Sequence, residues 1–454
     1  MKLYNSLIRK VENFEPIEAD KVKLFVCGPT VYDFSHLGHA KTYIQLDVLA
    51  RVLKDQGFDV FYLQNITDID DKIINRAKEN GISWEQLREK FESEYLKDMT
   101  SLGNTSVTQY ARATDYIEDI IRQVKVLLDK GHAYKIADGI YFEVATFPGY
   151  GKLSGRTKVT QNDAQTRIDH SEEKKGWNDF CLWKFSKPGE PVWDASFGDG
   201  RPGWHIEDTA ITEHFFGPQY DIHGGAVDLI FPHHEAEITQ MESASGKVPF
   251  VRHWVHTGFL NIDDAKMSKS KGNFFTIREV LEKGHDPMSV RMLTLQSHYR
   301  ATINFSWDLL EAAKIRLQSY QTMADRRFQS TGIKDIRQEL QKTQKAIREA
   351  LADDLNTPQA LAVLSELEVA IDNSGISLSA QEAFNTFIDW IDSILGLRLG
   401  SSIDITEKEK QLIKTREAAR RAKDWSKSDE LRDELGQQGI GVRDTGHGQI
   451  WFRL

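Results

Sequence analysis

Cysteine is scarce in this chain of 454 residues, which contains only Cys27 and Cys181. Two cysteines cannot build a disulfide framework, so we expect free thiols or metal ligands. The chain also lacks any apolar run close to the ~20 residues needed to cross a bilayer, and its first ten residues contain no apolar signal core. These absences predict a cytoplasmic protein that does not bind a membrane.

Positive charge is in the minority, with 58 Lys and Arg against 68 Asp and Glu and a net charge of −10. This balance argues against indiscriminate nucleic-acid binding. It allows a local basic surface, because repulsion between distant charges is screened beyond about 8–10 Å. The length exceeds what one hydrophobic core serves and predicts about two to four domains.

The chain opens with a β-α-β pattern. Residues 22–27 form a short apolar run, a Gly-Pro pair interrupts it, and apolar residues recur at helical spacing from about His39. A second strand is predicted at Asp59–Leu63. Such a start is typical of a parallel sheet that binds ligands beyond the carboxyl ends of its strands, where Cys27 lies.

The predicted fold class is α/β, with three domains. A Rossmann-like catalytic domain with a parallel sheet spans residues 1–306 and carries an α/β insertion at about 110–200, which is rich in Gly, Pro and Trp. Apolar stripes at helical spacing predict an α-helical bundle over 307–400. A small mixed C-terminal domain is predicted over 401–454.

Two motifs point to a nucleotide. His36, Leu37, Gly38 and His39 open the first helix, where imidazoles and free backbone N–H groups suit a triphosphate. Gly38 lacks a Cβ and lets a flat base approach. Such a four-residue motif is weak by itself, because it arises by chance.

The second motif is Lys-Met-Ser-Lys-Ser at 266–270, followed by Lys-Gly-Asn. It predicts a cationic loop that grips phosphates as they gain charge, although by itself it could be a solvated basic turn. The two motifs in this order, after a β-α-β start, are the signature of class I aminoacyl-tRNA synthetases.

Along its whole length the chain resembles the cysteinyl-tRNA synthetase family. The matching stretches are VCGPTVYDFSHLGHA, NITDIDDKII, GRPGWHIE, YDIHGGAVDLIFPHHEAEI, KMSKSKGNFFT and DDLNTP. The resemblance implies an ATP-dependent ligase that forms cysteinyl-adenylate and transfers cysteine to the 3′-terminal ribose of tRNA(Cys). It also implies Mg²⁺ with ATP, and we expect a monomer.

The resemblance further implies one zinc ion per chain, which would favour the thiolate of cysteine over the hydroxyl of serine. Its ligands would be Cys27, the residue at 208, His233 and Glu237. The family usually has a second cysteine at 208, whereas this chain has Asp208. Cys181 lies among apolar and aromatic residues and is interpreted as a small buried hydrophobe. A zinc with three protein ligands, or no zinc, stays open.

Other roles also follow from the resemblance. ATP binding falls on His36, Gly38, His39 and Lys269, and the catalytic set is His36, His39, Lys266 and Lys269. The cysteine substrate would meet Cys27, Thr67, Trp204 and Asp228. For Trp204 and Thr67 the alternative is ordinary core packing.

The C-terminal residues carry a predicted basic helix at Lys410–Leu435, followed by a Gly-rich turn and a short strand at Gln449–Arg453. Cations can track phosphates and an exposed aromatic ring can stack on an unpaired base. By resemblance, the anticodon would be recognised by Arg420, Trp425, Asp429 and Asp444. The alternative is a solvated charged helix with Trp425 in the core.

Two other functions are weighed. A ligase that passes activated cysteine to a small amine would not need the helical and basic residues 307–454. A non-catalytic tRNA-binding relative would not need His36, His39, Lys266 and Lys269.

Overall fold

The computed structural model describes residues 1–156, 171–262, 265–266, 274–332 and 334–454. Two compact units divide the chain. The first comprises residues 1–283 and 299–304, and the second comprises 284–298 and 305–454.

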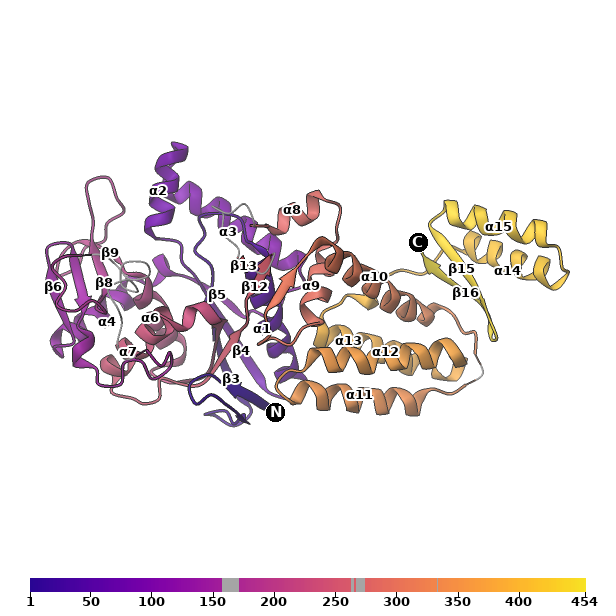
Figure 1. Ribbon diagram of the computed structural model, residues 1–454, viewed down its shortest axis with the longest axis horizontal. Coiled ribbons are helices and arrows are strands. Elements are labelled where there is room, and N and C mark those ends of the chain that lie inside the picture. Colours follow the sequence, from indigo (N-terminus) through magenta and orange to yellow (C-terminus); the bar gives the residue numbers. More distant parts are fainter. Residues whose placement is uncertain (157–170, 263–264, 267–273, 333) are drawn as a thin grey trace. The chain divides into compact units, whose positions relative to one another are not determined.

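A five-stranded parallel sheet forms the centre of the first unit (Figure 1). Its order is β11-β10-β3-β4-β5, with β3 (Lys21–Val26), β4 (Asp59–Ile66), β5 (Gln109–Arg112), β10 (Tyr220–Ala226) and β11 (Val251–Thr257). Because β3 pairs with β4 on one side and β10 on the other, the direction of strand succession reverses at β3. Ligands bind at such switch points. The predicted Rossmann-like α/β sheet is therefore confirmed.

Helix α1 (Leu37–Asp55) follows β3, as the spacing of apolar residues predicts. Most of its residues are buried. Gly57, just beyond its end, has φ 94°, a conformation that a residue with a side chain rarely adopts. The chain then enters β4, which starts at the predicted residue, Asp59, and continues to Ile66.

Further helices of the first unit flank the sheet and the insertion. Several begin at side chains that accept from backbone N–H groups of the first turn, among them Asp70, Ser83 and Thr276. The helices are α2 (Asp71–Asn80), α3 (Trp84–Ser101), α4 (Ile117–Asp129), α6 (Trp204–Phe216), α7 (His233–Ser245) and α8 (Ile277–Glu282).

An antiparallel sheet of four strands lies within the predicted insertion. Its strands are β6 (Ala133–Ile136), β7 (Gly139–Phe142), β8 (Phe180–Phe185) and β9 (Gly200–Pro202). Cys181 on β8 is fully buried, as expected for a small hydrophobe. Smaller strands are β1 (Lys2–Asn5), β2 (Lys10–Asn13), β12 (Leu260–Ile262), β13 (Ala265–Lys266) and β14 (Ile303–Phe305).

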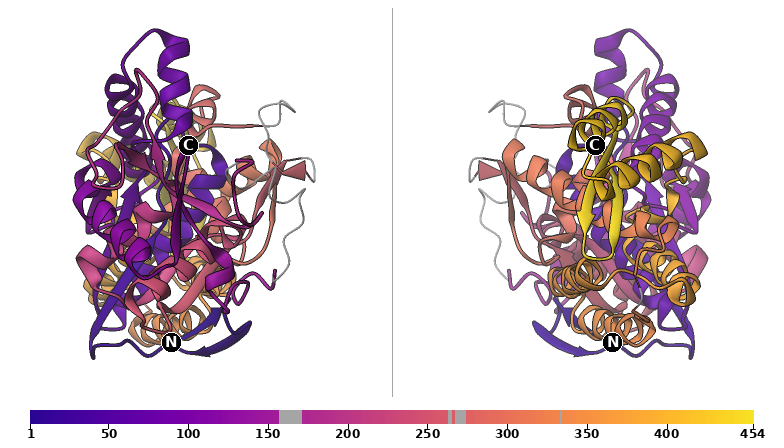
Figure 2. Two further views of the ribbon diagram at one scale, coloured as in Figure 1. Left: turned by 90° about the vertical axis from the view of Figure 1, so that its left-hand side faces the viewer. Right: turned by 90° about the vertical axis from the view of Figure 1, so that its right-hand side faces the viewer.

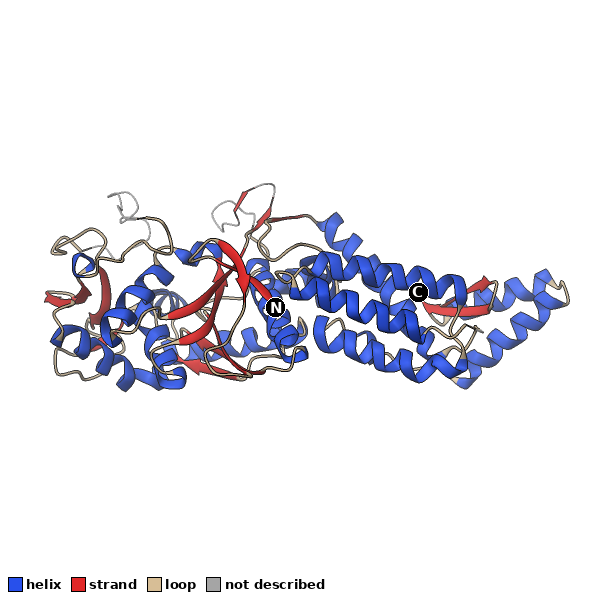
Figure 3. Cartoon of the chain, turned by 90° about the horizontal axis from the view of Figure 1, so that it is seen from below, coloured by secondary structure: helices blue, strands red, loops and turns tan. Residues whose placement is uncertain are grey.

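Helices dominate the second unit (Figure 3). They include α9 (Pro287–Leu295), α10 (Trp307–Ala324), α11 (Arg337–Ala352), α12 (Thr357–Ser374) and α13 (Gln381–Leu395). Helices α10 to α13 each bury one set of mainly apolar residues, and α9 is buried on nearly all sides. This confirms the predicted helical character. Within the described part of the chain, no helix is both long and apolar enough to span a membrane.

The C-terminal residues form α14 (Glu407–Arg421), α15 (Trp425–Gln437), and a hairpin of β15 (Ile440–Thr445) and β16 (Gly448–Arg453) (Figure 2). A single helix over 410–435 was predicted, and that prediction is wrong. Lys423 adopts a left-handed conformation with φ 61°, which ends the first helix. The side chain of Asp424 then accepts from Lys427 N and starts the second helix.

Candidate active site and metal centre

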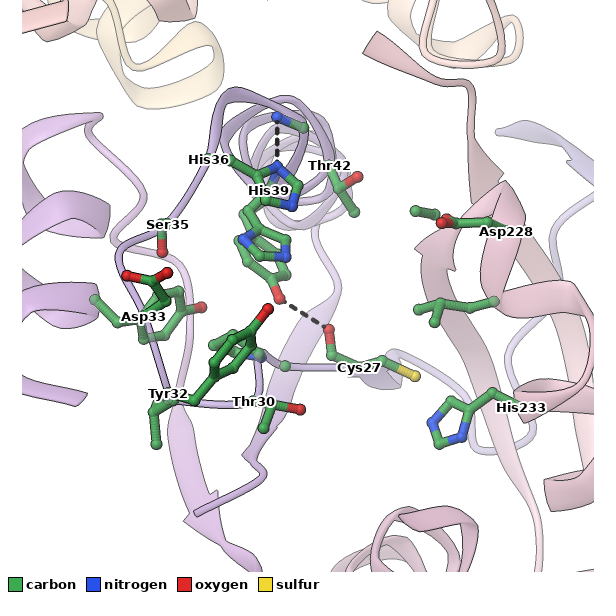
Figure 4. Close-up of a pocket in the computed structure, with 18 of the residues that line it drawn as sticks. Cys27, Thr30, Tyr32, Asp33, Ser35, His36, His39, Thr42, Asp228 and His233 are labelled. Carbon is green, nitrogen blue, oxygen red and sulfur yellow. Dashed lines mark hydrogen bonds between the residues drawn. The ribbon is translucent and has the colours of Figure 1, made fainter. Parts of the chain in front are cut away.

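A cavity of about 480 Å³ lies where the chain leaves β3 and β10 (Figure 4). This is the sheet edge at which ligand binding was predicted. Residues of both predicted sites line the same cavity, namely His36, Gly38 and His39 together with Cys27, Trp204, Asp208, Asp228 and His233. The structure therefore places three of the proposed nucleotide residues and three of the four proposed metal ligands around one space, and Glu237 is not among the lining residues.

His36 is the N-cap of α1. Its Nδ1 accepts hydrogen bonds from the backbone N–H groups of Gly38 (3.1 Å) and His39 (3.3 Å). Leu37 N donates to Phe275 O at 3.0 Å. The expectation that these N–H groups are free for a triphosphate is therefore wrong. The imidazole of His36 occupies two of them, and the carbonyl of Phe275, five residues after the Lys-Met-Ser-Lys-Ser motif, occupies the third.

His39 stacks on His36 with ring centroids 3.7 Å apart (Figure 4). Burial lowers the pKa of His39 to about 4, so this imidazole is neutral at neutral pH. Its Nδ1 is buried and has no hydrogen-bond partner among the described residues. His39 therefore lines the cavity without bringing a positive charge to it.

The four predicted metal ligands meet at the other side of the cavity. The ligand atoms of Cys27, Asp208, His233 and Glu237 all lie within 4.8 Å of one another, and all four residues are buried. His233 Nε2 lies 3.0 Å from Asp208 Oδ2 and 3.0 Å from Glu237 Oε1. The spacing of four residues puts His233 and Glu237 on one face of α7. Figure 4 shows the sulfur of Cys27 directed toward His233.

Two further histidines, which were not predicted from the sequence, approach the same sulfur. Cys27 Sγ lies 3.2 Å from His223 Nε2 and 3.1 Å from His234 Nε2. With Cys27 and Glu237 they form a second group that could hold a metal. Neither histidine lines the cavity, whereas Asp208 and His233 do. The group that contains Asp208 is therefore the one open to a substrate.

The charges of this cluster fit a divalent cation. Burial raises the pKa of the Cys27 thiol well above its usual value, and the carboxylates of Glu237 and Asp208 raise it further. Burial, followed by the charge of Asp208, also raises the pKa of Glu237. Anionic forms of three neighbouring buried acids are costly without a cation, and a bound metal favours them. One sulfur, one imidazole and two carboxylates are all donors that zinc accepts.

Neighbouring side chains orient the predicted ligands. The Trp204 ring stacks on His233, with centroids 4.2 Å apart, and His205 Nδ1 lies 2.7 Å from His233 Nδ1. Asn65 Nδ2 donates to Asp208 Oδ1 at 2.6 Å. Both His233 and Asp208 are thus held from the side opposite to the proposed metal.

The remaining predicted residues are placed as follows. Trp204 and Asp228 line the cavity. Thr67 does not line it, because the side chain is buried and Oγ1 donates to Glu207 Oε2 at 2.9 Å. The backbone of Lys266 pairs with Asn261 in the β12–β13 hairpin. Lys269 lies outside the described residues.

The residues predicted to recognise the anticodon gather around Trp425, except for Asp429. Trp425 is 55% exposed, so the alternative that it belongs to the domain core is wrong. The guanidinium of Arg420 lies over its ring at 5.3 Å and also pairs with Asp444 at 3.1 Å. Asp429 pairs with Arg432 at 3.2 Å. An exposed indole beside a cation is a surface on which a base can stack.

Comparisons with known proteins match this arrangement. The family model described as tRNA synthetases class I (C) catalytic domain matches residues 13–315. The DALR domain matches 346–400, and the Cysteinyl-tRNA ligase anticodon binding domain matches 403–451.

Curated relatives match over the whole length. The cysteine–tRNA ligase of Thermoplasma acidophilum is 42% identical over 455 residues, covering 100% of both chains. That of Caldicellulosiruptor saccharolyticus is 43% identical over 461 residues, covering 99% of this chain and 98% of the relative. Among solved structures, a Mycobacterium tuberculosis methionyl-tRNA synthetase with methionyl-adenylate has a TM-score of 0.59 at 16% identity, covering 84% of this chain and 92% of that chain. The chain therefore belongs to the cysteinyl-tRNA synthetase family of class I aminoacyl-tRNA synthetases.

Proposed function

We propose that this protein joins cysteine to ATP and then transfers the cysteinyl group to the 3′-terminal ribose of tRNA(Cys), in the cytoplasm. The observation that carries the proposal is the shared cavity, with the stacked histidines on one side and a thiol-compatible metal cluster on the other. Full-length similarity to cysteine–tRNA ligases supports the choice of amino acid and tRNA.

In the first step the carboxylate of cysteine attacks the α-phosphate of ATP. The bond between the α-phosphorus and the oxygen that bridges to the β-phosphate breaks, and pyrophosphate leaves. Mg²⁺ accompanying ATP would neutralise part of the charge on its phosphates. In the second step the terminal ribose hydroxyl, the 2′-hydroxyl as in other class I enzymes, attacks the carbonyl carbon, and AMP leaves. No side chain needs to act as a nucleophile, so the protein contributes positioning and charge stabilisation.

Several side chains of this chain supply the positioning. His36 fixes the start of α1, and His39 presents a neutral imidazole to the nucleotide. Cys27, Asp208, His233 and Glu237 would hold zinc. A bound zinc would select the substrate thiolate over a hydroxyl, a distinction that pocket shape alone makes poorly.

Cysteine-dependent exchange of pyrophosphate into ATP tests the proposal, with serine and alanine as controls. We expect exchange with cysteine and background rates with the other two. Equal exchange with serine would contradict the proposed selection. Exchange without charging of tRNA(Cys) would favour a ligase that acts on a small amine, and absence of exchange would favour a non-catalytic tRNA-binding protein.

Asp208 provides a prediction about the metal. We expect its carboxylate oxygen to bind zinc at ~2.0–2.2 Å and the Cys27 sulfur at ~2.3 Å. Asp208→Cys should keep zinc and activity, because one anionic donor replaces another. Asp208→Ala should lose zinc affinity by a large factor, measured by chelator competition. Zinc bound with Asp208 directed away from it, in an experimental structure, would contradict this assignment.

Lys269 provides a prediction about the phosphates. Lys269→Ala should raise the barrier to adenylate formation by about 2–4 kcal/mol, because the cation stabilises charge that develops as pyrophosphate leaves. The affinity for ATP should change much less. Pre-steady-state adenylate formation and equilibrium ATP binding, measured on the same variant, separate the two effects. Weaker ATP binding with an unchanged rate at saturation would contradict this role.

A further inference from the structure

Asn65 connects two of the segments that carry metal ligands. It lies near the end of β4 and is 2% exposed. Its Oδ1 accepts from Gly28 N at 2.5 Å, and Gly28 directly follows Cys27. Its Nδ2 donates to Asp208 Oδ1 at 2.6 Å. One buried amide thus links the end of β3 to α6, directly beside the proposed ligands.

The orientation of this amide is determined by its partners. A backbone N–H can only donate, so the atom of Asn65 that faces Gly28 must be the oxygen. The amide nitrogen then faces Asp208 Oδ1, a carboxylate oxygen that accepts its hydrogen bond. A flipped amide would place two donors together on one side and two acceptors together on the other. Both hydrogen bonds therefore favour the same arrangement.

Gly28 allows this close connection. A Cβ on Gly28 would lie 1.7 Å from the backbone oxygen of Asn65, so a residue with a side chain cannot fit without displacing β4. The approach of the two segments is therefore built into the backbone, and the Asn65 amide holds it in register.

The consequence concerns the two oxygens of Asp208. Asn65 occupies Oδ1, while Oδ2 lies 3.0 Å from His233 Nε2, on the side of the metal cluster. A carboxylate can rotate and can bind a metal through one oxygen or both, whereas a thiolate has a single donor atom. An aspartate at this position therefore requires an orienting contact that a cysteine would not require.

We propose that Asn65 is a positioning residue that makes Asp208 a metal ligand through the single oxygen Oδ2. The proposal rests on the proposed function, because it assumes that the cluster holds zinc. Residues that orient ligands in this way typically account for a 10- to 100-fold change in metal affinity.

The test is a double-mutant cycle on zinc affinity, measured by chelator competition with the full-length protein. Asn65→Ala should weaken zinc binding by about 10- to 100-fold when Asp208 is present. In the Asp208→Cys background, the same change should alter affinity only within about twofold, the ordinary scatter of independent sites.

A second readout is the visible spectrum of the protein loaded with Co²⁺. We expect Asn65→Ala to change the ligand-field bands when Asp208 is present and to leave them unchanged in the Asp208→Cys background. Thr108→Val is the control. It removes a hydrogen bond of 3.1 Å that the Thr108 hydroxyl accepts from the backbone of Tyr62 on β4, and Thr108 does not line the cavity. This control should leave zinc affinity and the Co²⁺ spectrum unchanged.

Equal losses of zinc affinity from Asn65→Ala in both backgrounds would overturn the proposal, as would no loss in either. These results are distinguishable from a failure of the proposed function. That function fails if the unmodified protein does not exchange pyrophosphate with cysteine, whatever the cycle gives. The positioning role fails if exchange is normal and the cycle shows no coupling between Asn65 and Asp208.

Discussion

Replacing Cys27 with serine is expected to abolish cysteine activation while the protein stays folded. Cys27 supplies the only sulfur in either group of potential metal ligands found among the described residues. A serine hydroxyl is neutral at physiological pH, so the cluster would lose its thiolate and one negative charge together. Zinc affinity should fall by more than ~100-fold, the upper end of the effect of a residue that merely orients a ligand. Exchange of pyrophosphate should fall to background.

The fold should survive this change for a structural reason. Serine is slightly smaller than cysteine, and its hydroxyl would lie near His223 Nε2 and His234 Nε2, which approach the present sulfur to 3.2 and 3.1 Å. Either nitrogen can be a hydrogen-bond partner for the hydroxyl. The new hydroxyl would then be hydrogen-bonded, whereas an unpaired buried hydroxyl is a usual cause of large destabilisation at such a site.

Cys181→Ala is the matched control for this experiment. Cys181 is the other cysteine of the chain and is fully buried on β8, outside both ligand groups. The Cys181→Ala protein should have a zinc content and a rate of pyrophosphate exchange close to those of the unmodified protein. Near-normal exchange and metal content in a folded Cys27→Ser protein would contradict the metal hypothesis.

Local patterns in the sequence predict the elements around the site well. The apolar run at residues 22–27, the helix that follows and the strand from Asp59 all appear within a few residues of the prediction. Each depends on interactions between near neighbours in the chain, which periodicity reports directly. The pairing of β3 with β10, which creates the switch point, joins segments about 200 residues apart, and periodicity does not contain it.

The metal cluster shows the same limit. His233 and Glu237 could be paired from their helical spacing, but their meeting with Cys27 and Asp208 depends on that distant pairing. It could be predicted only by resemblance. His223 and His234 lay within a matching stretch and still were not predicted, because nothing in their spacing relates them to Cys27. In both rings Nδ1 faces away from Cys27. His223 Nδ1 lies 2.7 Å from Tyr220 OH, and His234 Nδ1 lies 2.8 Å from His256 Nε2.

Two local errors have local causes. His36 caps α1 with its own ring, whereas N-caps are usually Ser, Thr, Asp or Asn, so the backbone N–H groups were expected to be free. The division of the C-terminal helix depends on Lys423 in a left-handed conformation, with neither Gly nor Pro to mark it. Asp424 before Trp425 is an ordinary N-cap signal, but the charge pattern that continues across it predicts a single helix.

Deleting residues 402–454 is expected to spare cysteine activation and to impair charging of tRNA(Cys) severely. The cavity lies entirely in the first unit, whereas the exposed Trp425 and its neighbouring cations lie in the deleted segment. Each base of a three-base anticodon contributes about 1–3 kcal/mol to recognition. Losing all three contributions predicts at least a ~100-fold fall in kcat/KM for tRNA. Aminoacylation and pyrophosphate exchange, measured on the same preparation, give the two values.

The deletion also removes partners of the helical bundle, so a point variant must accompany it. Asp325 is fully buried and pairs with Arg453 at 3.0 Å, and Gln329 bonds to the backbone of Trp451. Trp425→Ala leaves these contacts in place. Loss of one stacked base should cost about 1–3 kcal/mol of transition-state stabilisation, which lowers kcat/KM for tRNA roughly 5- to 150-fold. Pyrophosphate exchange should stay unchanged.

Trp177→Ala is the matched control for the point variant, because Trp177 is also 55% exposed but belongs to the first unit. A general effect of removing a surface indole would lower charging in both variants, whereas base stacking at Trp425 predicts a loss in only one. The set of activities that is lost distinguishes a defect in recognition from a defect in folding. An unfolded protein would lose pyrophosphate exchange as well as charging. Unimpaired charging by the deleted protein would refute the assignment of residues 402–454 to anticodon recognition.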